Sequence, residues 1–356
     1  MAARVTIMAG GTGGHVFPAL DVANELKARG WTVSWLGTPD SFEARVVPAA
    51  GFELDTISVF RLRGQGITNS LMAPVRLVGS MRQAWRVFRR RRPELVLGMG
   101  GFVTGPGGLV SRLAGLPLVI HEQNAIPGLT NRWLARIARC VLEAFPGAFP
   151  PGVSARAVGN PLREAITRMS APGVISADRP LRLLVLGGSL GAQALNEHVP
   201  SALAVMSPET RPQVRHQAGR GKLESTRAAY RAAGVEAEVS EFVDDMADAY
   251  DWADLLICRA GALTVSEVMA AGVAALLVPY PFAVDDHQTA NARFLTDAEA
   301  AILLPQEQLA AGRLGELLSA LVNDRQRLYD MANRAYGLAR RDATAVVADA
   351  CEECLA

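Results

Sequence analysis

The residues best suited to chemistry lie in two glycine-rich segments. Residues 10–15 (GGTGGH) follow the apolar run 4–9, and residues 187–192 (GGSLGA) follow the apolar run 181–186. A glycine-rich turn between a strand and a helix lets backbone N–H groups approach an anion at the positive end of the helix dipole. One such turn is often purely structural. Two in matching positions, one opening each half of the chain, predict a protein that handles phosphate groups.

The two segments do not match the common nucleotide motifs. An NAD site needs G-x-G-x-x-G and a carboxylate at the end of the second strand. Here Val16 takes the third glycine position, and the expected second strands end in residues 36–38 (LGT) and 217–219 (QAG). A P-loop needs Gly-Lys-Ser/Thr, whereas residues 221–223 are GKL. We therefore expect a split site, with a nucleotide in one half and another anion in the other.

Length and composition narrow the class of protein. The 356 residues predict about two domains, and the apolar half of them suffices for two cores. A formal charge of +1 argues against nucleic-acid binding. The four cysteines form no secreted disulfide framework, and no signal peptide precedes residue 4, so the chain reads as cytosolic. The uncharged run 268–284 is short for a membrane span and is expected to form a helix, a turn and a strand.

Strands and helices alternate after each glycine segment. A helix is expected over 18–29, and buried strands are expected at 31–36, 95–97, 118–120, 140–144, 213–217, 237–239, 255–258 and 274–278. Apolar strands separated by helices suit parallel sheets covered on both faces. The predicted fold class is α/β, with two Rossmann-like parallel-sheet domains facing each other across a cleft. We place them at 1–163 and 164–340, with a last helix packing back on the first domain through 341–356.

Six short motifs carry a resemblance to a known family. They are residues 10–18 (GGTGGHVFP), 98–101 (GMGG), 121–124 (HEQN), 159–161 (GNP), 187–189 (GGS) and 262–267 (ALTVSE). In this order the chain resembles glycosyltransferase family 28, the undecaprenyldiphospho-muramoylpentapeptide β-N-acetylglucosaminyltransferases that form lipid II of peptidoglycan. The resemblance covers residues 4 to about 340. It implies the GT-B fold, an inverting mechanism, UDP-GlcNAc as donor and lipid I as acceptor, without a cofactor or a metal. It also implies a peripheral place on the cytoplasmic side of the bacterial inner membrane.

The resemblance also implies a donor site, mostly in the second half. Ser189 would bond the diphosphate, the backbone of Val243 would read the uracil edge, and Glu267 would take the ribose hydroxyls. The other implied donor contacts are Thr12, Gly13, Gly14, Asn124, Arg163, Ala262, Leu263, Thr264, Val265 and Ser266.

Two of these contacts have local alternatives. A carboxylate accepts strong hydrogen bonds from a diol, but Glu267 follows Thr264 by three residues and could instead complete a helix capping box. The guanidinium of Arg163 could reach a leaving diphosphate, or it could be a surface arginine.

Residues 285–288 (DDHQ) follow an expected strand, where open α/β sheets bind ligands. The resemblance implies contact with the transferred sugar here, through His287 or Gln288. A metal at Asp285, Asp286 and His287 would lack a distant ligand.

Transfer to a hydroxyl needs a general base. His15 is our candidate because it follows the first glycine segment and titrates near neutral pH. It could instead only bond the diphosphate or the backbone, in which case Glu122 is the next candidate. Gly100, Gly101 and Gly107 are assigned to the acceptor side. Phe102 replaces a tyrosine found in some relatives.

Residues 71–92 predict a basic amphipathic helix. Leu77, Met81, Trp85 and Phe88 recur at helical spacing and are expected to face the core. Arginines surround them at positions 82, 86 and 89–92. For these arginines and the loop 61–72, a solvated rim and an anionic membrane surface remain open.

Three other functions remain as alternatives. They are a different GT-B glycosyltransferase or epimerase acting on a glycolipid, a non-catalytic UDP-sugar-binding protein, and a nicotinamide oxidoreductase.

Overall fold

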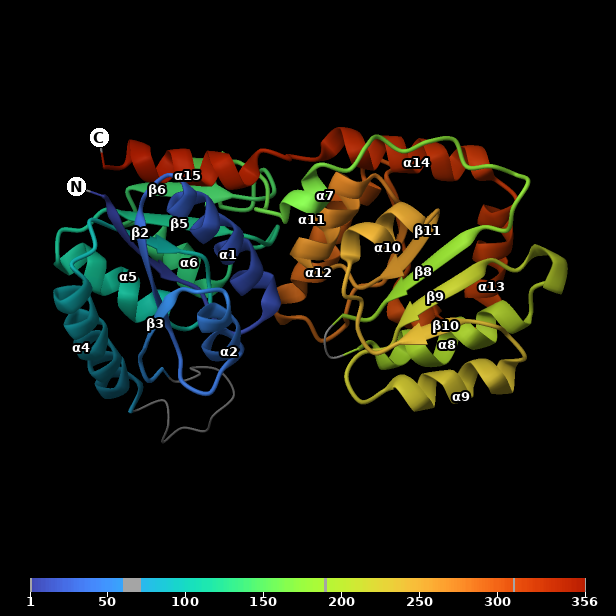
Figure 1. Cartoon of the computed structure of the whole chain (residues 1–356), viewed down its shortest axis with the longest axis horizontal. Helices are drawn as coiled ribbons and strands as arrows, with labels where there is room; N and C mark the ends of the chain where they lie inside the picture. Colours follow the sequence, from blue (N-terminus) through green and yellow to red (C-terminus); the bar gives the residue numbers. More distant parts are fainter. Residues whose placement is uncertain (1, 60–71, 189–190, 310, 356) are drawn as a thin grey trace. The chain divides into compact units, whose positions relative to one another are not determined.

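The computed structural model describes residues 2–59, 72–188, 191–309 and 311–355, so Ser189 and most of the loop 61–72 lie outside it. It divides into two compact units, Met1–Arg163 with Arg340–Ala356, and Glu164–Ala339. Each unit contains one sheet flanked by helices (Figure 1). The two Rossmann-like parallel sheets expected from the sequence are therefore confirmed, while the cleft between them stays a prediction.

The first unit contains a seven-stranded sheet in the order β3-β2-β1-β4-β5-β6-β7. Every neighbouring pair is parallel. The strands are β1 (Arg4–Met8), β2 (Thr32–Gly37), β3 (Glu53–Thr56), β4 (Leu95–Gly98), β5 (Leu118–Glu122), β6 (Cys140–Glu143) and β7 (Ala155–Ala157). The helices are α1 (Gly13–Ala28), α2 (Phe42–Ala49), α4 (Ala73–Arg91), α5 (Thr104–Leu113), α6 (Leu129–Leu134) and α15 (Ala343–Glu353).

Both faces of this sheet are buried. Leu95 and Leu97 of β4 join one apolar cluster with residues of α1 and α15, and Val96 between them joins another with residues of α4 and α5. Successive side chains of a strand point to opposite faces, so a strand covered on both sides must be apolar throughout. This is why β4 reads as an unbroken apolar run.

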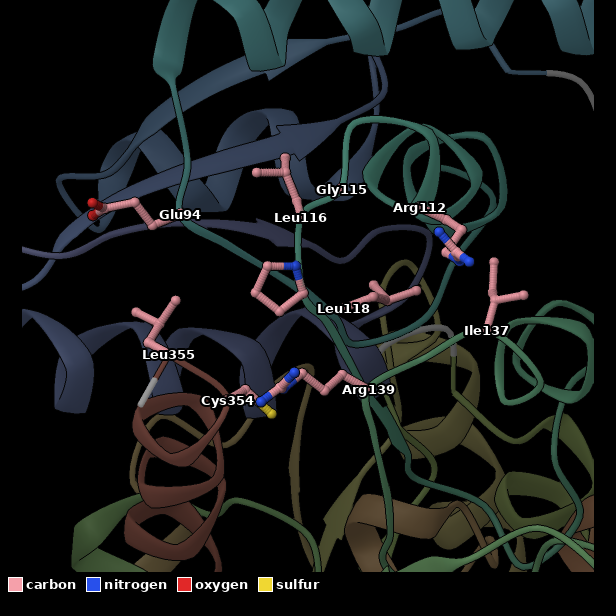
Figure 2. A pocket seen from close by; sticks show the side chains of 10 residues that line it. Glu94, Arg112, Gly115, Leu116, Leu118, Ile137, Arg139, Cys354 and Leu355 are labelled. Atoms are coloured by element: carbon pink, nitrogen blue, oxygen red, sulfur yellow. The ribbon is translucent and has the colours of Figure 1, made fainter.

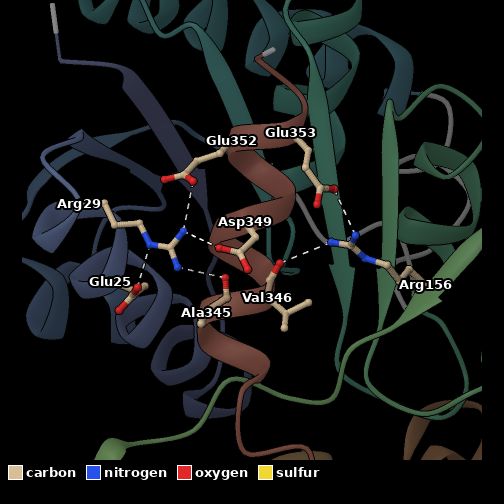
Figure 3. Close-up of polar contacts among 8 residues, drawn as sticks. All are labelled: Glu25, Arg29, Arg156, Ala345, Val346, Asp349, Glu352 and Glu353. Atoms are coloured by element: carbon tan, nitrogen blue, oxygen red, sulfur yellow. Dashed lines mark hydrogen bonds and ion pairs between the residues drawn. The ribbon is translucent and has the colours of Figure 1, made fainter.

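The C-terminal helix α15 packs on α1 of the first unit. Val347 and Cys351 are buried in the cluster that contains α1. The guanidinium of Arg29, at the end of α1, lies 2.6 Å from an Asp349 carboxylate oxygen and 3.3 Å from one of Glu352 (Figure 3). Apolar burial and this ion-pair network together attach the end of the chain to the first sheet.

The second unit contains a six-stranded parallel sheet in the order β10-β9-β8-β11-β12-β13. The strands are β8 (Arg182–Leu186), β9 (Gln213–Gln217), β10 (Glu238–Ser240), β11 (Leu255–Cys258), β12 (Ala274–Leu277) and β13 (Ala301–Leu303). The α-helices are α7 (Glu164–Thr167), α8 (Gln193–Ala204), α9 (Leu223–Ala233), α10 (Met246–Trp252), α11 (Ala262–Ala271), α12 (His287–Thr296), α13 (Ala311–Val322) and α14 (Arg325–Leu338). The 3-10 helices are η1 (Pro208–Thr210), η2 (Val284–Asp286) and η3 (Gln306–Gln308).

Residues 268–284 contain the end of α11 and β12, as expected. In the parts of the chain that the structure describes, every helix is too short or too polar to cross a bilayer.

The face of α4 differs from the expectation. Phe88 is buried, but Leu77 and Trp85 of the predicted core stripe are 39% and 41% exposed. The helix instead buries Ser80, Ala84, Val87 and Phe88. The stripe prediction holds for Phe88 and for Met81, which packs against the core cluster of this face, and is wrong for Leu77 and Trp85. The small residues Ser80 and Ala84 allow α4 to pack closely through a neighbouring face, which leaves these two larger side chains outside.

Candidate functional site

The order of the strands places the glycine segments. In each sheet the chain first builds strands on one side and then crosses to the other, at β1/β4 in the first unit and β8/β11 in the second. The loops after these neighbouring strands diverge to opposite faces, and ligands of open α/β sheets bind in the resulting crevice. The segments 10–15 and 98–103 therefore meet at one such point. At the other, Gly187 and Gly188 follow β8, and residues 259–262 follow the neighbouring strand β11.

In the first unit the two glycine segments touch. The Gly10 N–H donates to the Gly100 carbonyl at 3.3 Å. A Cβ on Gly101 would lie 2.4 Å from the Gly10 carbonyl oxygen, and Gly101 has φ +90°. Only glycine fits at Gly101 without moving this backbone. Helix α1 starts at Gly13, with Thr12 as its N-cap residue, so the amides of the segment stand at the helix N-terminus. The helix had been expected from Pro18, which lies inside it.

The buried carboxylate of Glu43 supports the first glycine segment and was missed by sequence reasoning. It accepts hydrogen bonds from the Gly11 N–H at 3.0 Å and from the Thr38 N–H and hydroxyl at 3.0 and 2.7 Å. Burial raises the pKa of Glu43, but these hydrogen bonds more than offset it and hold the pKa below its usual value. A carboxylate therefore does stand beside the end of β2, although it comes from α2. The only signal was an acidic residue in the first turn after the N-cap Ser41.

His15 lies in the first turn of α1, beside the segment after β4. Its Nδ1 is 2.9 Å from Gln123 Oε1, and Gln123 Nε2 donates to the Met99 carbonyl at 2.8 Å. A Cβ on Gly100 would lie 2.6 Å from His15 Nδ1. The imidazole is thus held between β5 and the loop after β4. Gln123, which is 1% exposed, was not singled out from the sequence.

The structure gives Glu122 a supporting position. One carboxylate oxygen accepts from the Asn124 N–H at 3.0 Å and from its side-chain amide at 3.2 Å. The other accepts from the Gly128 N–H at 3.1 Å and from the Asn131 amide at 2.8 Å. Four bonds to the loop 124–128 and to α6 occupy this buried carboxylate. It is a poor candidate for a mobile proton acceptor, and the Asn124 side chain is bound to it.

His121 and Gly107 both belong to the buried framework. His121 Nε2 is 2.8 Å from the Gly159 carbonyl, and burial lowers the pKa of His121 to about 4, so it stays neutral. Gly107 is buried in α5, where a Cβ would lie 2.2 Å from Met8 Sδ. Position 107 requires glycine because α5 packs closely on β1 there. This buried position gives no support to a contact between Gly107 and the acceptor. Phe102, in contrast, is exposed.

Arg163 lies against α1. Its guanidinium carbon is 5.0 Å from the centroid of the Phe17 ring. Asp21, one turn further along α1, interacts electrostatically with Arg163. Burial raises the pKa of Asp21 to about 7, against a smaller lowering by Arg163.

The raised pKa of Asp21 makes stability depend on pH. The folded protein keeps Asp21 protonated up to about pH 7, whereas the unfolded chain loses this proton near pH 4. The free energy of unfolding therefore falls as pH rises through this window. We expect Asp21→Asn to change it little at pH 4 and to raise it by on the order of 2–4 kcal/mol at pH 8. Urea unfolding at both pH values measures this, with Asp297→Asn as an exposed control. An equal effect of Asp21→Asn at both pH values would contradict it.

In the second unit, Gln217 holds the glycine segment after β8. Its amide oxygen accepts from the Gly188 N–H at 3.0 Å, and its nitrogen donates to the carbonyls of Gly188 and Glu241 at 3.1 and 2.9 Å. Gly188 has φ +79°. The segment is thereby fixed to the ends of β9 and β10. Ser189 itself lies outside the described residues.

Helix α11 begins beside that segment, with Gly261 as its N-cap residue. Thr264 and Glu267 are therefore both inside the helix, and the capping-box interpretation of Glu267 is wrong. Glu267 instead accepts a hydrogen bond from the buried Tyr250 hydroxyl at 2.9 Å. Ala262, Val265 and Ser266 are buried, whereas Leu263, Thr264 and Glu267 are half-buried.

The remaining predicted donor residues lie on loops of the second unit. Val243 lies between β10 and α10 and is half-buried. His287 opens α12, after Asp285 and Asp286 with φ of 53° and 51°. The amide oxygen of Gln288 accepts from the Tyr280 N–H at 2.9 Å, which orients that side chain. Both sugar-contact candidates thus stand near the carboxyl end of β12.

Models of known families match both units. The N-terminal domain of glycosyltransferase family 28 matches residues 5–143, and the C-terminal domain of this family matches residues 182–347. The chain belongs to glycosyltransferase family 28.

Relatives in this family match over their whole length. The protein of Aeromonas hydrophila is 54% identical over 99% of this chain and 97% of its own, and that of Neisseria meningitidis is 53% identical over 98% of each. Both are named UDP-N-acetylglucosamine–N-acetylmuramyl-(pentapeptide) pyrophosphoryl-undecaprenol N-acetylglucosamine transferase.

Solved structures match as well. The crystal structure of MurG from Acinetobacter baumannii has 43% identity and a TM-score of 0.84, over 99% of both chains. The calicheamicin glycosyltransferase CalG4, at 18% identity and a TM-score of 0.70, shares the fold.

Among the described residues of this family 28 chain, no group of three or more His, Cys, Asp or Glu side chains is arranged to hold a metal ion. A pocket of about 500 Å³ lies at the amino ends of β4, β5 and β6 (Figure 2). The glycine segments of the first unit follow the carboxyl ends of its strands. Arg112, Arg139 and the apolar Leu116, Ile137 and Leu355 are among the residues that line it. None of the residues that line this pocket is a predicted site residue.

Proposed function

We propose that this chain transfers N-acetylglucosamine from UDP-GlcNAc to the 4-hydroxyl of the muramic sugar of lipid I, forming lipid II in peptidoglycan synthesis. The observation that carries the proposal is the full-length identity of 53–54% to relatives named for this transfer. The two units of the fold, each with a glycine segment at its crossover, agree with a substrate pair in which both members carry a diphosphate.

The transfer is a single displacement with inversion at C1 of the sugar. The acceptor hydroxyl forms the new bond to C1, the bond from C1 to the diphosphate oxygen breaks, and UDP leaves with that electron pair. His15 takes the hydroxyl proton. Gln123 and the loop after β4 hold this imidazole in place. Glu122 is left out of the chemistry because hydrogen bonds within the chain occupy both of its oxygens.

The second unit binds the donor in this proposal. Developing charge on the diphosphate is stabilised by the amides of the segment after β8 and by the N-terminus of α11. Gln217 fixes that segment before the donor arrives. Glu267, held by Tyr250, accepts hydrogen bonds from the ribose hydroxyls. The backbone of Val243 reads the uracil, Ser189 bonds the diphosphate, and His287 or Gln288 contacts the sugar.

The test is UDP release by the purified chain with UDP-GlcNAc and a short-chain lipid I analogue. We expect release only when both are present, and a disaccharide product by mass spectrometry. Release with diacylglycerol in place of the analogue would favour a glycolipid glycosyltransferase. UDP-GlcNAc binding without release under either condition would favour a non-catalytic binding protein.

We further propose that α4 docks on an anionic membrane surface. Val75, Val78 and Trp85 are 63%, 47% and 41% exposed. Arg82, Arg86 and Arg89 share this side of the helix and are exposed as well. Apolar side chains among basic ones fit a bilayer whose surface is negative.

Neighbouring elements of the first unit add apolar side chains to this surface and reduce its basic charge. The neighbouring helix α5 also exposes Leu113, and α6 exposes Trp133. Arg90 and Arg91 are ion-paired with Asp55. On this side of α4 the exposed basic side chains are Arg82, Arg86 and Arg89, whereas Asp55 engages Arg90 and Arg91.

Charge reversal tests the docking surface. We expect Arg82→Glu, Arg86→Glu and Arg89→Glu together to weaken binding to phosphatidylglycerol vesicles by at least about 100-fold, because each basic residue contributes about 1 kcal/mol near such a surface. Vesicle sedimentation measures the binding. The matched control reverses Arg231, Arg313 and Arg327, exposed arginines of the second unit, with the same change in net charge. Equal loss in both triple variants would contradict a surface on α4.

A further inference from the structure

The hydrogen bonds around Gln123 determine which nitrogen of His15 carries a proton. The Met99 carbonyl can only accept, so the Gln123 atom 2.8 Å from it must be the amide nitrogen. The amide oxygen of Gln123 therefore faces His15, at 2.9 Å from Nδ1. Since an amide oxygen can only accept, Nδ1 must donate. In the neutral imidazole this leaves Nε2 without a proton and able to accept one.

We propose that Gln123 is a positioning residue that holds His15 as the Nδ1–H tautomer, so that Nε2 is the nitrogen that receives the acceptor proton. The inference rests on the proposed function for the role of His15, but the tautomer itself follows from the contacts alone. A histidine base in the wrong tautomer presents an N–H where a lone pair is needed. In serine proteases such a change costs roughly 10⁴-fold in turnover.

The surroundings of Gln123 make this arrangement rigid. Its backbone carbonyl accepts from the Asn160 side chain at 3.1 Å, and its side chain is buried. The Met99 N–H donates to the Met8 carbonyl at 2.8 Å, which ties the acceptor of the amide to β1. Rotating the Gln123 amide by 180° would place its oxygen against the Met99 oxygen and its N–H₂ group against His15 Nδ1. The first contact would then be repulsive, so the network has one stable direction.

Gly100 lies close to the same ring nitrogen. It has φ +100°, and a Cβ there would approach His15 Nδ1 to 2.6 Å and Cε1 to 2.9 Å. A side chain at position 100 would therefore displace the imidazole from its place beside Gln123. His121 has a charge interaction with His15, and its burial keeps His121 neutral near pH 7. The hydrogen bond to Gln123 is therefore the contact that selects the tautomer of His15.

Nuclear magnetic resonance of the full chain labelled with ¹⁵N-histidine tests the tautomer directly. The chain has five histidines, and the His15 signals are those absent from His15→Ala. At about pH 8.5, where imidazole is neutral, we expect a protonated Nδ1 and an unprotonated Nε2. A protonated Nε2 in the parent protein would overturn the proposal whatever the activity of any variant.

Two substitutions test the positioning role. Gln123→Met keeps the length of the side chain but offers Nδ1 only a weak acceptor. We expect it to shift His15 toward the Nε2–H tautomer and to lower kcat by about 10- to 1000-fold, with the KM for UDP-GlcNAc within about threefold. Gln123→Glu can still accept from Nδ1, and its second oxygen must carry a proton to donate to the Met99 carbonyl as the amide does. It should retain the Nδ1–H tautomer and more activity than Gln123→Met. The control Gln326→Met, on the exposed side of α14, should leave both readouts unchanged.

The outcomes separate this inference from the function on which it rests. A Gln123→Met protein with unchanged His15 signals would overturn the positioning role, and so would equal losses in Gln123→Met and Gln123→Glu. If the tautomer is as expected and depends on Gln123, but His15→Ala turns over normally, the tautomer stands and His15 is removed from the chemistry.

Discussion

Replacing His15 with alanine is expected to lower kcat of acceptor-dependent UDP release by about 10²- to 10⁴-fold, which is the usual contribution of a general base. The affinity for UDP should stay within about threefold, because His15 belongs to the first unit and most of the implied donor contacts belong to the second. A large loss of kcat with little change in UDP affinity is what the role of a general base implies. A base acts on the acceptor hydroxyl in the transition state and contributes little to ground-state binding of the donor.

Steady-state kinetics with a short-chain lipid I analogue and titration calorimetry with UDP measure the two quantities. Glu122→Gln is a useful comparison, because it keeps the volume of a residue that hydrogen bonds occupy within the chain. We expect its main effect on stability, with residual activity well above that of His15→Ala. Unchanged kcat in His15→Ala would remove this residue from the reaction, and a larger kcat loss in Glu122→Gln would exchange the two roles.

Replacing Glu267 with alanine should weaken UDP binding by about 10- to 100-fold. Hydrogen bonds to a charged group contribute about 1.5–3 kcal/mol each, and the substitution also leaves the buried Tyr250 hydroxyl without this partner. Tyr250→Phe should have a smaller effect, about 3- to 10-fold, because the carboxylate remains but loses the contact that orients it.

A ligand without ribose hydroxyls isolates the interaction. We expect the parent to prefer UDP over 2′,3′-dideoxy-UDP and Glu267→Ala to bind the two almost equally, so that the double-mutant cycle gives a coupling of at least about 1 kcal/mol. Calorimetry with both ligands measures the four affinities. If Glu267→Ala loses affinity for both nucleotides by the same factor, the carboxylate supports α11 rather than the ribose.

Much of the fold was predictable because its causes are local. Residues 4–9 and 181–186 are mostly apolar, and each is followed by a glycine segment and a helix. Such a strand needs cover on both faces, which a parallel sheet with helices provides. The strands β3 (ELDT), β7 (ARA) and β13 (AIL) were missed. They are only three or four residues long, and ELDT and ARA have little apolar pattern of their own, so the neighbouring strand that pairs with them decides their conformation.

The exposed face of α4 shows a second limit. Helical spacing of Leu77, Trp85 and Phe88 predicted one buried stripe, yet the helix buries Ala84 and Val87 with Phe88 and leaves Trp85 outside. A helical period tells which residues share a face. Which of two adjoining faces packs depends on the shape of the partner, and small residues allow the closer approach.

The sequence by itself determined the two Rossmann-like parallel sheets, the pair of glycine segments and the motif that opens α11, because each is encoded in consecutive residues. Only the tertiary structure decided which polar side chains are already occupied. Gln123 lies 108 positions from His15, and Glu43 lies 32 positions from Gly11, yet each pair forms a hydrogen bond. Those contacts engage Nδ1 of His15 and bind both oxygens of Glu122 within the chain. A hydrogen bond depends on distance and direction in space, and these follow from the packing of strands whose separation along the chain carries no such information.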